Sequence, residues 1–397
     1  MGLDGKSVLI SGIGIAGPAL AFWLARHGLV PTLVERAPAL RRGGYVIDFW
    51  GAGYDIAEQM GVLPDILRAG YRVQEVRIVD GHGRRRGGFD AEVFREVALG
   101  RYTTVARREL GAVLFRAVES RVESLFGDSI TALEQQPDGV LVRFAHAPAR
   151  RFDLVVGADG LHSTVRRLVF GPEARFERYL GQIVAAFEVT GYPHRDPDVY
   201  VAYAAPGRQI ARFTLRDDRV LFLCVFAEDR ADVVDRGDHA GQREYVRRQL
   251  SGLGWECAEI AAALARSDEL YFDPVSQIWM DRWTTGRIAL VGDAAYAPSL
   301  LAGQGSALAL IGAYVLAGEL GRADRIEDAF ARYEALLQPF MRHKQKAAEG
   351  FAGSFAPKTR LGIFVRNQVT KLFNARHLAK LAFSRSLVDR IQLPHYV

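Results

Sequence analysis

The stretch Ser7-Val8-Leu9-Ile10-Ser11-Gly12-Ile13-Gly14-Ile15-Ala16-Gly17 decides the fold of this 397-residue chain. Its first four residues predict a short β-strand. Residues 18–27 predict a helix, because their apolar side chains recur on one helical face. Residues 32–34, followed by Glu35, predict the next strand. Strand, glycine turn, helix and strand in this order indicate a βαβ unit with parallel strands.

The glycines form a G-x-G-x-x-G turn, which predicts a dinucleotide site. Gly12 allows the tight turn, Gly14 lets a pyrophosphate approach the backbone, and Gly17 lets the helix pack close to the strand. Free amides at the helix start, around Ala16, then face the pyrophosphate. Glu35 is placed to accept hydrogen bonds from ribose hydroxyls and disfavours a 2′-phosphate, which favours FAD or NAD. A glycine turn without a ligand is the alternative.

Two later segments repeat the pattern of a buried strand that ends in a polar turn. Residues 152–156 lead into Gly157-Ala158-Asp159-Gly160, and residues 287–291 lead into Gly292-Asp293. Both strands are nearly all apolar, as central parallel strands are. Ligands of open α/β sheets bind at the carboxyl ends of the strands, so the Asp293 carboxylate is placed to hold a ribityl hydroxyl.

A helix rich in Ala and Leu begins at Gly303-Gln304-Gly305-Ser306. Its first amides are placed to face the pyrimidine edge of a flavin ring, where the helix dipole favours the reduced anion. Ala309 and Gly312 are small, which lets this helix pack tightly.

Residues 182–225 have a different pattern, in which successive predicted strands are separated by turns at 191–193, 206–208 and 217–218. This pattern predicts an antiparallel sheet of hairpins. The expected fold is α/β: a discontinuous Rossmann-like FAD-binding domain with an inserted antiparallel β-sheet substrate domain and C-terminal helices. The expected boundaries are 1–175 and 275–340 for the FAD-binding domain, 176–274 for the substrate domain and 341–397 for the helical segment.

Composition excludes several classes of protein. The net charge is +5, and the run Arg84-Arg85-Arg86 is expected to be an exposed, solvated loop, with attraction of an anionic dinucleotide as the alternative. No nucleic-acid-binding motif, metal-ligand spacing, signal peptide or apolar run of about 20 residues occurs. Cys224 and Cys257 are isolated, which favours a reducing, cytoplasmic location.

The motifs together resemble the class A FAD-dependent monooxygenases, the aromatic hydroxylases with the p-hydroxybenzoate hydroxylase fold. The segment 41–48 also resembles the subset that includes the tetracycline-inactivating monooxygenases. The residues that carry the resemblance are Gly12–Gly17 with Glu35-Arg36, Ala158-Asp159-Gly160, and Gly292-Asp293-Ala294-Ala295 with Pro298 and Gly303-Gln304-Gly305.

The resemblance implies non-covalent FAD and a role for each matching position. Glu35, beside Arg36, would bind the adenosine ribose, Arg107 would contact the FAD linker, Asp159 would serve both FAD and the nicotinamide cofactor, Asp293 would hold the ribityl chain, and Arg41 and Gly44 would lie by the flavin on a mobile loop. Relatives often have His after Gly-Asp-Ala-Ala, whereas this chain has Tyr296.

The implied reaction uses NADPH or NADH as a transient reductant, and a flavin C4a-hydroperoxide transfers one oxygen atom from O2 to an aromatic or polyketide-like substrate. No catalytic side chain is assigned, and Pro298 and Gly44 are expected near the ring. The substrate pocket is expected between the inserted sheet and the flavin. Its candidate walls are Pro298 and the aromatic residues Tyr200, Tyr203, Phe213, Phe222 and Phe226; for each aromatic residue a plain core role is the alternative, with at least equal weight.

Three further charged or titratable residues were considered as site residues, and the sequence gives them little support. Arg212 is expected to face solvent, and His162 and His194 show no catalytic constellation. Two alternatives remain for the function: a flavin-dependent reductase or dehydrogenase, and a flavin-binding module without turnover. Small-molecule substrate and O2 are the expected partners, and the chain is expected to be a monomer or homodimer.

Overall fold

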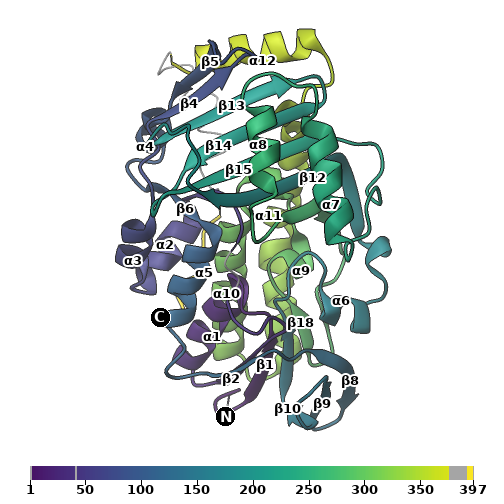
Figure 1. The fold of residues 1–397 in the computed structure, drawn as a ribbon. Coiled ribbons are helices and arrows are strands. Elements are labelled where there is room, and N and C mark those ends of the chain that lie inside the picture. Colours follow the sequence, from purple (N-terminus) through teal and green to yellow (C-terminus); the bar gives the residue numbers. More distant parts are fainter. Residues whose placement is uncertain (1, 41–42, 375–390, 397) are drawn as a thin grey trace.

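The computed structural model describes residues 2–40, 43–374 and 391–396, and Figure 1 shows their arrangement. A six-stranded sheet grows from the glycine-rich stretch in the lower half of the figure, in the order β17-β18-β11-β1-β2-β7. Its strands are β1 (Ser7–Ser11), β2 (Val30–Glu35), β7 (Glu123–Phe126), β11 (Leu154–Gly157), β17 (Thr284–Thr285) and β18 (Ile288–Leu290).

Five of these strands run parallel, and only β17 runs antiparallel to its neighbour. Strand β1 lies between β2 and β11, and β18 follows β11, so the strands that precede the three polar turns are direct neighbours. Their buried, apolar side chains are covered on both faces. The three turns therefore meet at one edge of this sheet.

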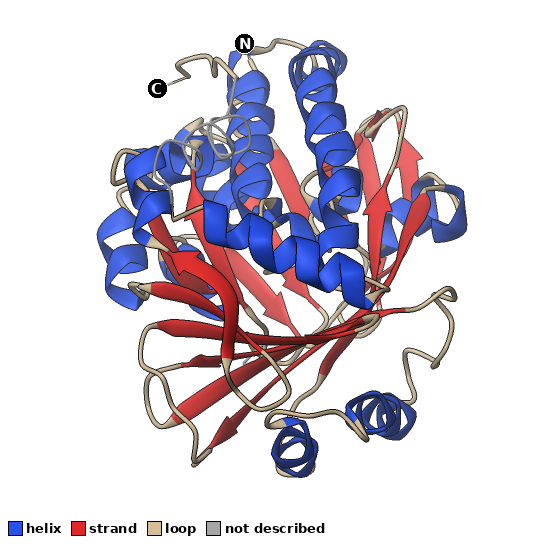
Figure 2. Cartoon of the chain, turned by 90° about the horizontal axis from the view of Figure 1, so that it is seen from above, coloured by secondary structure: helices blue, strands red, loops and turns tan. Residues whose placement is uncertain are grey.

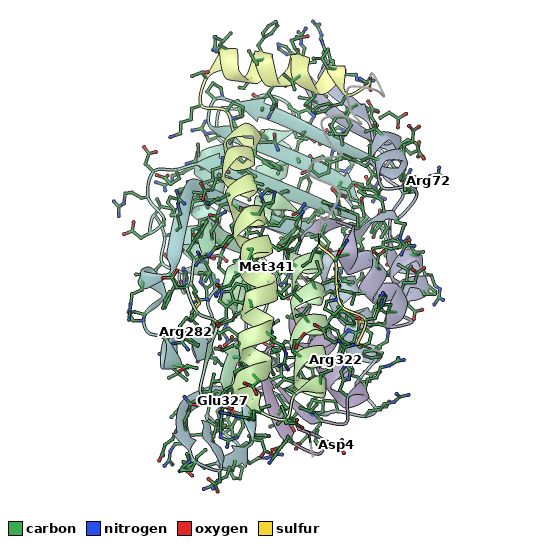
Figure 3. All side chains as sticks on the ribbon, turned by 180° about the vertical axis from the view of Figure 1, so that it is seen from behind. Asp4, Arg72, Arg282, Arg322, Glu327 and Met341 are labelled. Atoms are coloured by element: carbon green, nitrogen blue, oxygen red, sulfur yellow. The ribbon has the colours of Figure 1, made fainter. Side chains whose placement is uncertain are left out.

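Helices of the lower half pack around this sheet. Helix α10 lies against α1 and α2, and the long helix α11 runs along the back of the molecule, where Figure 3 labels Glu327 near its start and the buried Met341 midway. The helices are α1 (Ala16–Arg26), α2 (Ala52–Gln59), α3 (Leu63–Ala69), α5 (Arg107–Arg116), α10 (Gly305–Arg322) and α11 (Ile326–Phe355).

A seven-stranded sheet occupies the upper half, in the order β16-β12-β15-β14-β13-β4-β5. All its pairings are antiparallel except β4 with β13. Its strands are β4 (Glu75–Val79), β5 (Arg85–Asp90), β12 (Glu177–Thr190), β13 (Val199–Ala205), β14 (Arg208–Thr214), β15 (Arg219–Ala227) and β16 (Tyr271–Ile278).

The arginine run corrects one expectation. Arg85 and Arg86 are not in a loop but begin the edge strand β5, where they form ion pairs with Glu75 and Asp80. The side chains are exposed, as expected for charges on a sheet edge, where they discourage pairing with another chain. Strands β4 and β5 of the large sheet both come from the first 175 residues of the chain, which were expected to belong to the FAD-binding domain.

The two faces of the large sheet have different partners. Helices α7 (His239–Leu250) and α8 (Cys257–Leu264) cover one face, as Figure 2 shows from above. The opposite face turns toward the two-stranded sheet of β3 (Val46–Trp50) and β6 (Tyr102–Ala106), with an apolar cluster between them. That second face is therefore the one that meets the lower half of the molecule.

Smaller elements complete the fold. A three-stranded sheet contains β8 (Ile130–Gln136), β9 (Gly139–Phe144) and β10 (Arg150–Phe152). The remaining helices are α4 (Glu92–Val97), α6 (Thr164–Val169), α9 (Asp293–Tyr296) and α12 (Arg360–Leu372), with 3-10 turns η1 (Glu173–Arg175) and η2 (Leu300–Ala302).

The fold class predicted from the sequence is confirmed. The domain boundaries remain a prediction; helix α11 runs unbroken through residue 340, where one boundary was expected. Among the helices of residues 2–40, 43–374 and 391–396, none is both long and apolar enough to cross a membrane.

Candidate active site

The three glycines of the first motif have three different surroundings. A Cβ atom on Gly12, whose φ is +109°, would lie 2.5 Å from the carbonyl oxygen of Ala158. On Gly17 it would lie 1.9 Å from the carbonyl oxygen of Gly12, so the start of α1 is packed onto the turn. On Gly14 it would meet no atom within 4 Å. Gly14 therefore borders open space, which suits the approach of a pyrophosphate.

Glu35 lies beside this turn at the end of β2. Its two carboxylate oxygens accept hydrogen bonds from the backbone amides of Ile13 and Ala37, each at 2.9 Å. The half-buried side chain is thus fixed next to the glycine turn, where a ribose would lie. Arg36 beside it is exposed.

Asp159, in the second motif, organises the protein backbone. Its carboxylate accepts hydrogen bonds from the Ser163 hydroxyl and from the amides of Thr164 and Val165, the first residues of α6. Burial raises the pKa of Asp159, and these hydrogen bonds oppose the rise. A carboxylate at a helix N-terminus is stabilised by the helix dipole, so Asp159 anchors α6 to the sheet.

Arg166 joins the second motif to the third, and the sequence reasoning missed it. Its guanidinium is fully buried and donates to the carbonyl oxygens of Leu161 and Ala294 and to Glu173. Burial lowers the pKa of Arg166, while nearby carboxylates oppose the change. Arg166 and Arg167 are indistinguishable in the sequence, and only the phase of α6, set by its Ser163 cap, selects which of them is buried.

The third motif reaches back to the first. A Cβ atom on Gly292, whose φ is +67°, would lie 3.1 Å from the Cβ of Ala16. On Gly305, the first residue of α10, it would lie 3.5 Å from Oδ1 of Asp293. Gly12 against Ala158, Gly292 against Ala16, and Arg166 bonded to Ala294 thus connect all three motifs in pairs.

Asp293 and Arg107 share this edge of the sheet. Burial raises the pKa of Asp293, and the positive charges of Arg107 and Arg166 oppose the rise. Arg107 begins α5, and its backbone amide donates to the carbonyl oxygen of Tyr45 at 3.0 Å. Burial lowers the pKa of Arg107, but Tyr45, Asp293 and Tyr271 together outweigh burial. The pKa of Arg107 is therefore above its ordinary value. A cation is therefore held beside the carboxylate at this edge.

The loop from residue 298 to residue 304 has unusual backbone geometry. Ser299 has a φ of +111°, and Gly303 is left-handed with a φ of +66°. Gln277 fixes the loop by donating from its buried side chain to the carbonyl oxygen of Pro298 at 2.9 Å. Helix α10 then begins at Gly305, and Gln304, Gly305 and Ser306 at its start are half-buried. The first amides of a helix have no acceptor within it, so this end suits a ligand with negative charge.

Tyr296, at the position where the resemblance led us to expect a histidine, has a packing role. Its ring is buried beneath α10, where a Cβ atom on Gly312 would lie only 1.8 Å from the tyrosine hydroxyl. The Tyr333 hydroxyl lies 3.4 Å from that of Tyr296. The small residue expected at position 312 therefore makes room for this tyrosine.

Gly44 and Tyr45 lie next to Arg107. Gly44 has a φ of +143°, and a Cβ atom there would meet nothing within 4 Å. The Tyr45 ring packs against Tyr271 of the large sheet, with centroids 5.6 Å apart. Burial raises the pKa of Tyr45 to about 12. Arg41, also expected near the flavin, lies outside the described residues.

The structure separates the expected substrate-pocket residues. Phe213 and Tyr200 lie on the face of the large sheet that meets Tyr45. Tyr203 and Phe222, together with Phe226, lie on the other face, in the cluster covered by α7 and α8. Tyr200 and Tyr203 are three positions apart on β13 and therefore point to opposite faces. Phe213 pairs with Leu221, so the next residue, Phe222, points to the face opposite to that of Phe213. The expectation that Tyr203, Phe222 and Phe226 line the pocket is therefore corrected.

Two charged side chains also differ from expectation. Arg212 does not face solvent: it is 4% exposed and is paired with Asp196 and Glu256. His162 bridges two carboxylates, Asp273 at 2.9 Å and Glu173 at 3.0 Å. Burial lowers the pKa of His162, but these hydrogen bonds outweigh burial and raise it to about 9. His162 thus links the second motif to strand β16 of the large sheet.

These residues fit FAD. The turn leaves room at Gly14, the Glu35 carboxylate stands beside it, and the start of α10 lies next to Asp293. Room for a pyrophosphate, an acid for a ribose and a positive helix end for a flavin thus follow one edge of the sheet.

Comparison with known proteins agrees with this geometry. A family model described as an FAD binding domain matches residues 6–339. Protein Rv1260 of Mycobacterium tuberculosis is 39% identical over 349 residues, which cover 86% of this chain and 92% of that protein. A flavin-dependent monooxygenase of Legionella longbeachae is 32% identical over 403 residues, with 98% of both chains covered. The crystal structure of tetracycline destructase Tet(55) is 32% identical, with a TM-score of 0.86 and 100% of both chains covered.

The chain therefore belongs to the FAD binding domain family. Within this family it is an FAD-dependent monooxygenase, as the resemblance in the sequence predicted. This assignment replaces the two alternatives that the sequence left open, a flavin-dependent reductase or dehydrogenase and a flavin-binding module without turnover.

Proposed function

We propose that the enzyme oxidises NADPH or NADH and inserts one atom of O2 into an aromatic or polyketide-like small molecule. The observation that carries this proposal is the pairwise contact of the three motifs at one sheet edge. The large sheet turns an apolar face toward Tyr45, whose carbonyl accepts from the amide of Arg107 near that edge. Such a site holds a flavin on one side and leaves the other side for a substrate.

The chain's own groups have distinct tasks in binding FAD. The backbone around Gly14 and Ala16 would receive the pyrophosphate, Glu35 the ribose, and Asp293 the ribityl chain. The start of α10 would stabilise negative charge on the ring. When bound, FAD supplies the redox chemistry, taking two electrons from the nicotinamide and activating O2.

The surrounding residues control water and position. The Tyr45 ring packs against Tyr271 between the two halves, and Phe213 belongs to the same apolar cluster; water is excluded where such side chains pack. The cation of Arg107 beside Asp293 limits the net negative charge at this edge. One similar structure is a tetracycline destructase, which supports a polycyclic substrate for this chain.

The location and the nicotinamide contact remain part of the proposal. The free thiols of Cys224 and Cys257 are both buried, which supports a reducing location such as the cytoplasm. Asp159 anchors α6. Its proposed part in nicotinamide binding would therefore be indirect, because it sets the position of that helix.

The test is turnover under ¹⁸O2 with phenolic and polyketide compounds, tetracycline included. In the balanced reaction, substrate, O2, NAD(P)H and one proton give hydroxylated substrate, NAD(P)⁺ and water. We expect one compound to stimulate nicotinamide oxidation and to gain a single ¹⁸O atom by mass spectrometry. Anaerobic conversion of the substrate, or incorporation of oxygen only from H2¹⁸O, would overturn the proposal.

A further inference from the structure

Helix α12 turns apolar side chains to the solvent. It lies across the top of the molecule in Figure 1, and Figure 3 shows it there from behind. Large apolar side chains with 43–71% of their surface exposed make up five of its 13 residues: Leu361, Phe364, Val365, Val369 and Leu372. The other exposed large apolar side chains of the described residues are scattered over three separate segments: Val30, Leu67 and Leu99. Scattered apolar residues are ordinary on a surface, whereas a contiguous group marks a site of interaction.

The five side chains share one side of α12. They follow one another at intervals of three, one, four and three residues, with the exposed Gln368 among them. At 3.6 residues per turn, this spacing keeps them within about 140° of the helix circumference. The helix start is defined by the Thr359 hydroxyl, which accepts a hydrogen bond from the amide of Gly362 at 3.0 Å.

The opposite side of α12, which meets the large sheet, is polar. Asn367 is its buried residue. The Thr370 hydroxyl accepts from the amide of Gly88 on β5 at 3.2 Å, and Arg366 donates to Gln209 of β14 at 2.7 Å. A surface helix ordinarily packs its apolar side on the core and turns its polar side to water. Polar contacts therefore fasten α12, and the fold does not account for its apolar side.

The charge beside this apolar side is positive. From Gly350 to Asn374 the sequence has lysine and arginine but neither aspartate nor glutamate. Arg360 and Lys371 are exposed near the two ends of α12 and form no ion pair with any other described residue. Lys358, just before the helix, pairs with Asp229 at 3.0 Å. An apolar side flanked by cations is the pattern of a helix that lies on an anionic lipid surface.

The size of the surface favours lipid over a second copy of the chain. A helix of 13 residues is about 20 Å long and about 10 Å wide, so one side offers roughly 200 Å². A stable dimer buries about 800 Å² per partner. Antiparallel pairing of two such helices would also bring Arg360 of one copy beside Lys371 of the other, with no carboxylate on α12 to compensate. An interfacial helix needs less area, because anionic headgroups attract its cations.

We propose that α12 binds the enzyme to a membrane surface that carries anionic phospholipid headgroups. The helix lies parallel to that surface, with its five apolar side chains at the boundary between headgroups and acyl chains and with Arg360 and Lys371 among the headgroups. This inference goes beyond the proposed function and does not depend on it.

The test is co-sedimentation of the FAD-loaded enzyme with vesicles of phosphatidylcholine, alone or mixed with an equal amount of phosphatidylglycerol. We expect binding to the mixed vesicles to be at least about tenfold tighter at 0.1 M KCl. The difference should shrink at 1 M KCl, because the Debye length falls from about 10 Å to about 3 Å. The double variant Leu361→Ser/Phe364→Ser should bind the mixed vesicles at least about tenfold more weakly, since two apolar side chains leave the interface.

The matched control is Leu67→Ser/Leu99→Ser, which removes two exposed apolar side chains elsewhere and should bind as the wild type does. The visible flavin spectrum shows whether each variant is folded. If Leu361→Ser/Phe364→Ser does not fold, Arg360→Gln/Lys371→Gln decides: its binding to the mixed vesicles should weaken and its binding to phosphatidylcholine should not change. Unchanged binding to the mixed vesicles would contradict the inference.

Three further results would overturn it: a wild type that binds neither kind of vesicle, equal binding to both kinds, or wild-type binding by a folded Leu361→Ser/Phe364→Ser variant. Light scattering tests the second copy. A dimer that dissociates in this variant, together with a wild type that ignores vesicles, would assign the apolar side of α12 to self-association. None of these measurements reads turnover, so their failure is distinguishable from failure of the proposed function.

Discussion

Arg166 and Ala294, 128 positions apart in the chain, are joined by a buried hydrogen bond of 2.9 Å from the guanidinium to the backbone carbonyl. The same side chain bonds to Leu161 and Glu173. One arginine with no exposed surface thus fixes the turn after β11 to the helix that follows β18. The spacing of the second and third motifs depends on it.

Arg166→Ala should therefore lower the free energy of unfolding by about 3–5 kcal/mol, because removing one partner leaves buried polar groups uncompensated. Urea denaturation of the apoprotein measures the loss. The neighbouring exposed arginine provides the control: Arg167→Ala should change stability by less than about 0.5 kcal/mol. Equal effects of the two substitutions would argue against the role of the buried guanidinium.

Gly14→Ala should separate folding from cofactor binding. A methyl group at Gly14 meets no protein atom, so stability should hardly change, but it would occupy the space proposed for the pyrophosphate. We expect FAD affinity to fall at least about tenfold in a flavin-fluorescence titration, while the apoprotein Tm stays within a few degrees.

Two further glycines calibrate that experiment. Gly17→Ala should destabilise the apoprotein itself, since its methyl group would contact the Gly12 carbonyl oxygen at 1.9 Å. Gly353→Ala, also without neighbours within 4 Å, should leave both properties unchanged. Wild-type FAD affinity in Gly14→Ala would place the pyrophosphate elsewhere.

Gly312→Ala should cost about 1–3 kcal/mol of stability through overpacking, because the added methyl group and the Tyr296 hydroxyl cannot share the space. Combining it with Tyr296→Phe removes the oxygen that lies 1.8 Å away and should recover part of the loss. A double-mutant cycle measured by thermal unfolding gives the coupling. Additive effects would mean that the helix, and not the tyrosine, sets the need for glycine.

His162 should make stability fall in alkaline solution. Burial and the charge of Arg236 lower its pKa, but Asp273 and Glu173 outweigh them and raise it to about 9, against 6.5 when unfolded. The folded state therefore binds the proton more tightly, so the stabilisation is complete below pH 6.5 and is lost as the pH rises through 9. Unfolding free energies from pH 6 to pH 10 should show this decrease in the wild type. In His162→Gln the decrease should be smaller; an identical slope would exclude His162 as its source.

The three motifs could be recognised in the sequence because the local backbone geometry requires their glycines and acids. Gly12 and Gly292 stand where a side chain would collide with a neighbouring motif, and Gly17 stands where one would collide with the Gly12 carbonyl of its own turn. The three strands were also recognisable, since strands buried on both faces are continuously apolar. Such features are encoded within about ten residues of chain.

What the sequence could not show depends on contacts between distant segments. Phe213 and Phe222 lie on different strands, so only the register between β14 and β15 shows that they point to opposite faces, and the packing of α7 and α8 decides which face is covered. Likewise β5 forms only because β4 offers an edge beside β13, and its own Arg- and Gly-rich sequence has little strand propensity. The burial of Arg212 follows from carboxylates on two other segments.

The most direct measurement is a crystal structure of the protein with FAD bound. The pyrophosphate should lie within hydrogen-bonding distance of the backbone amides between Gly14 and Gly17, with the isoalloxazine ring beside Gly303–Gly305. A flavin bound on the side of the large sheet covered by α7 and α8, or a pyrophosphate far from the first glycine turn, would contradict the convergence of the three motifs on one cofactor.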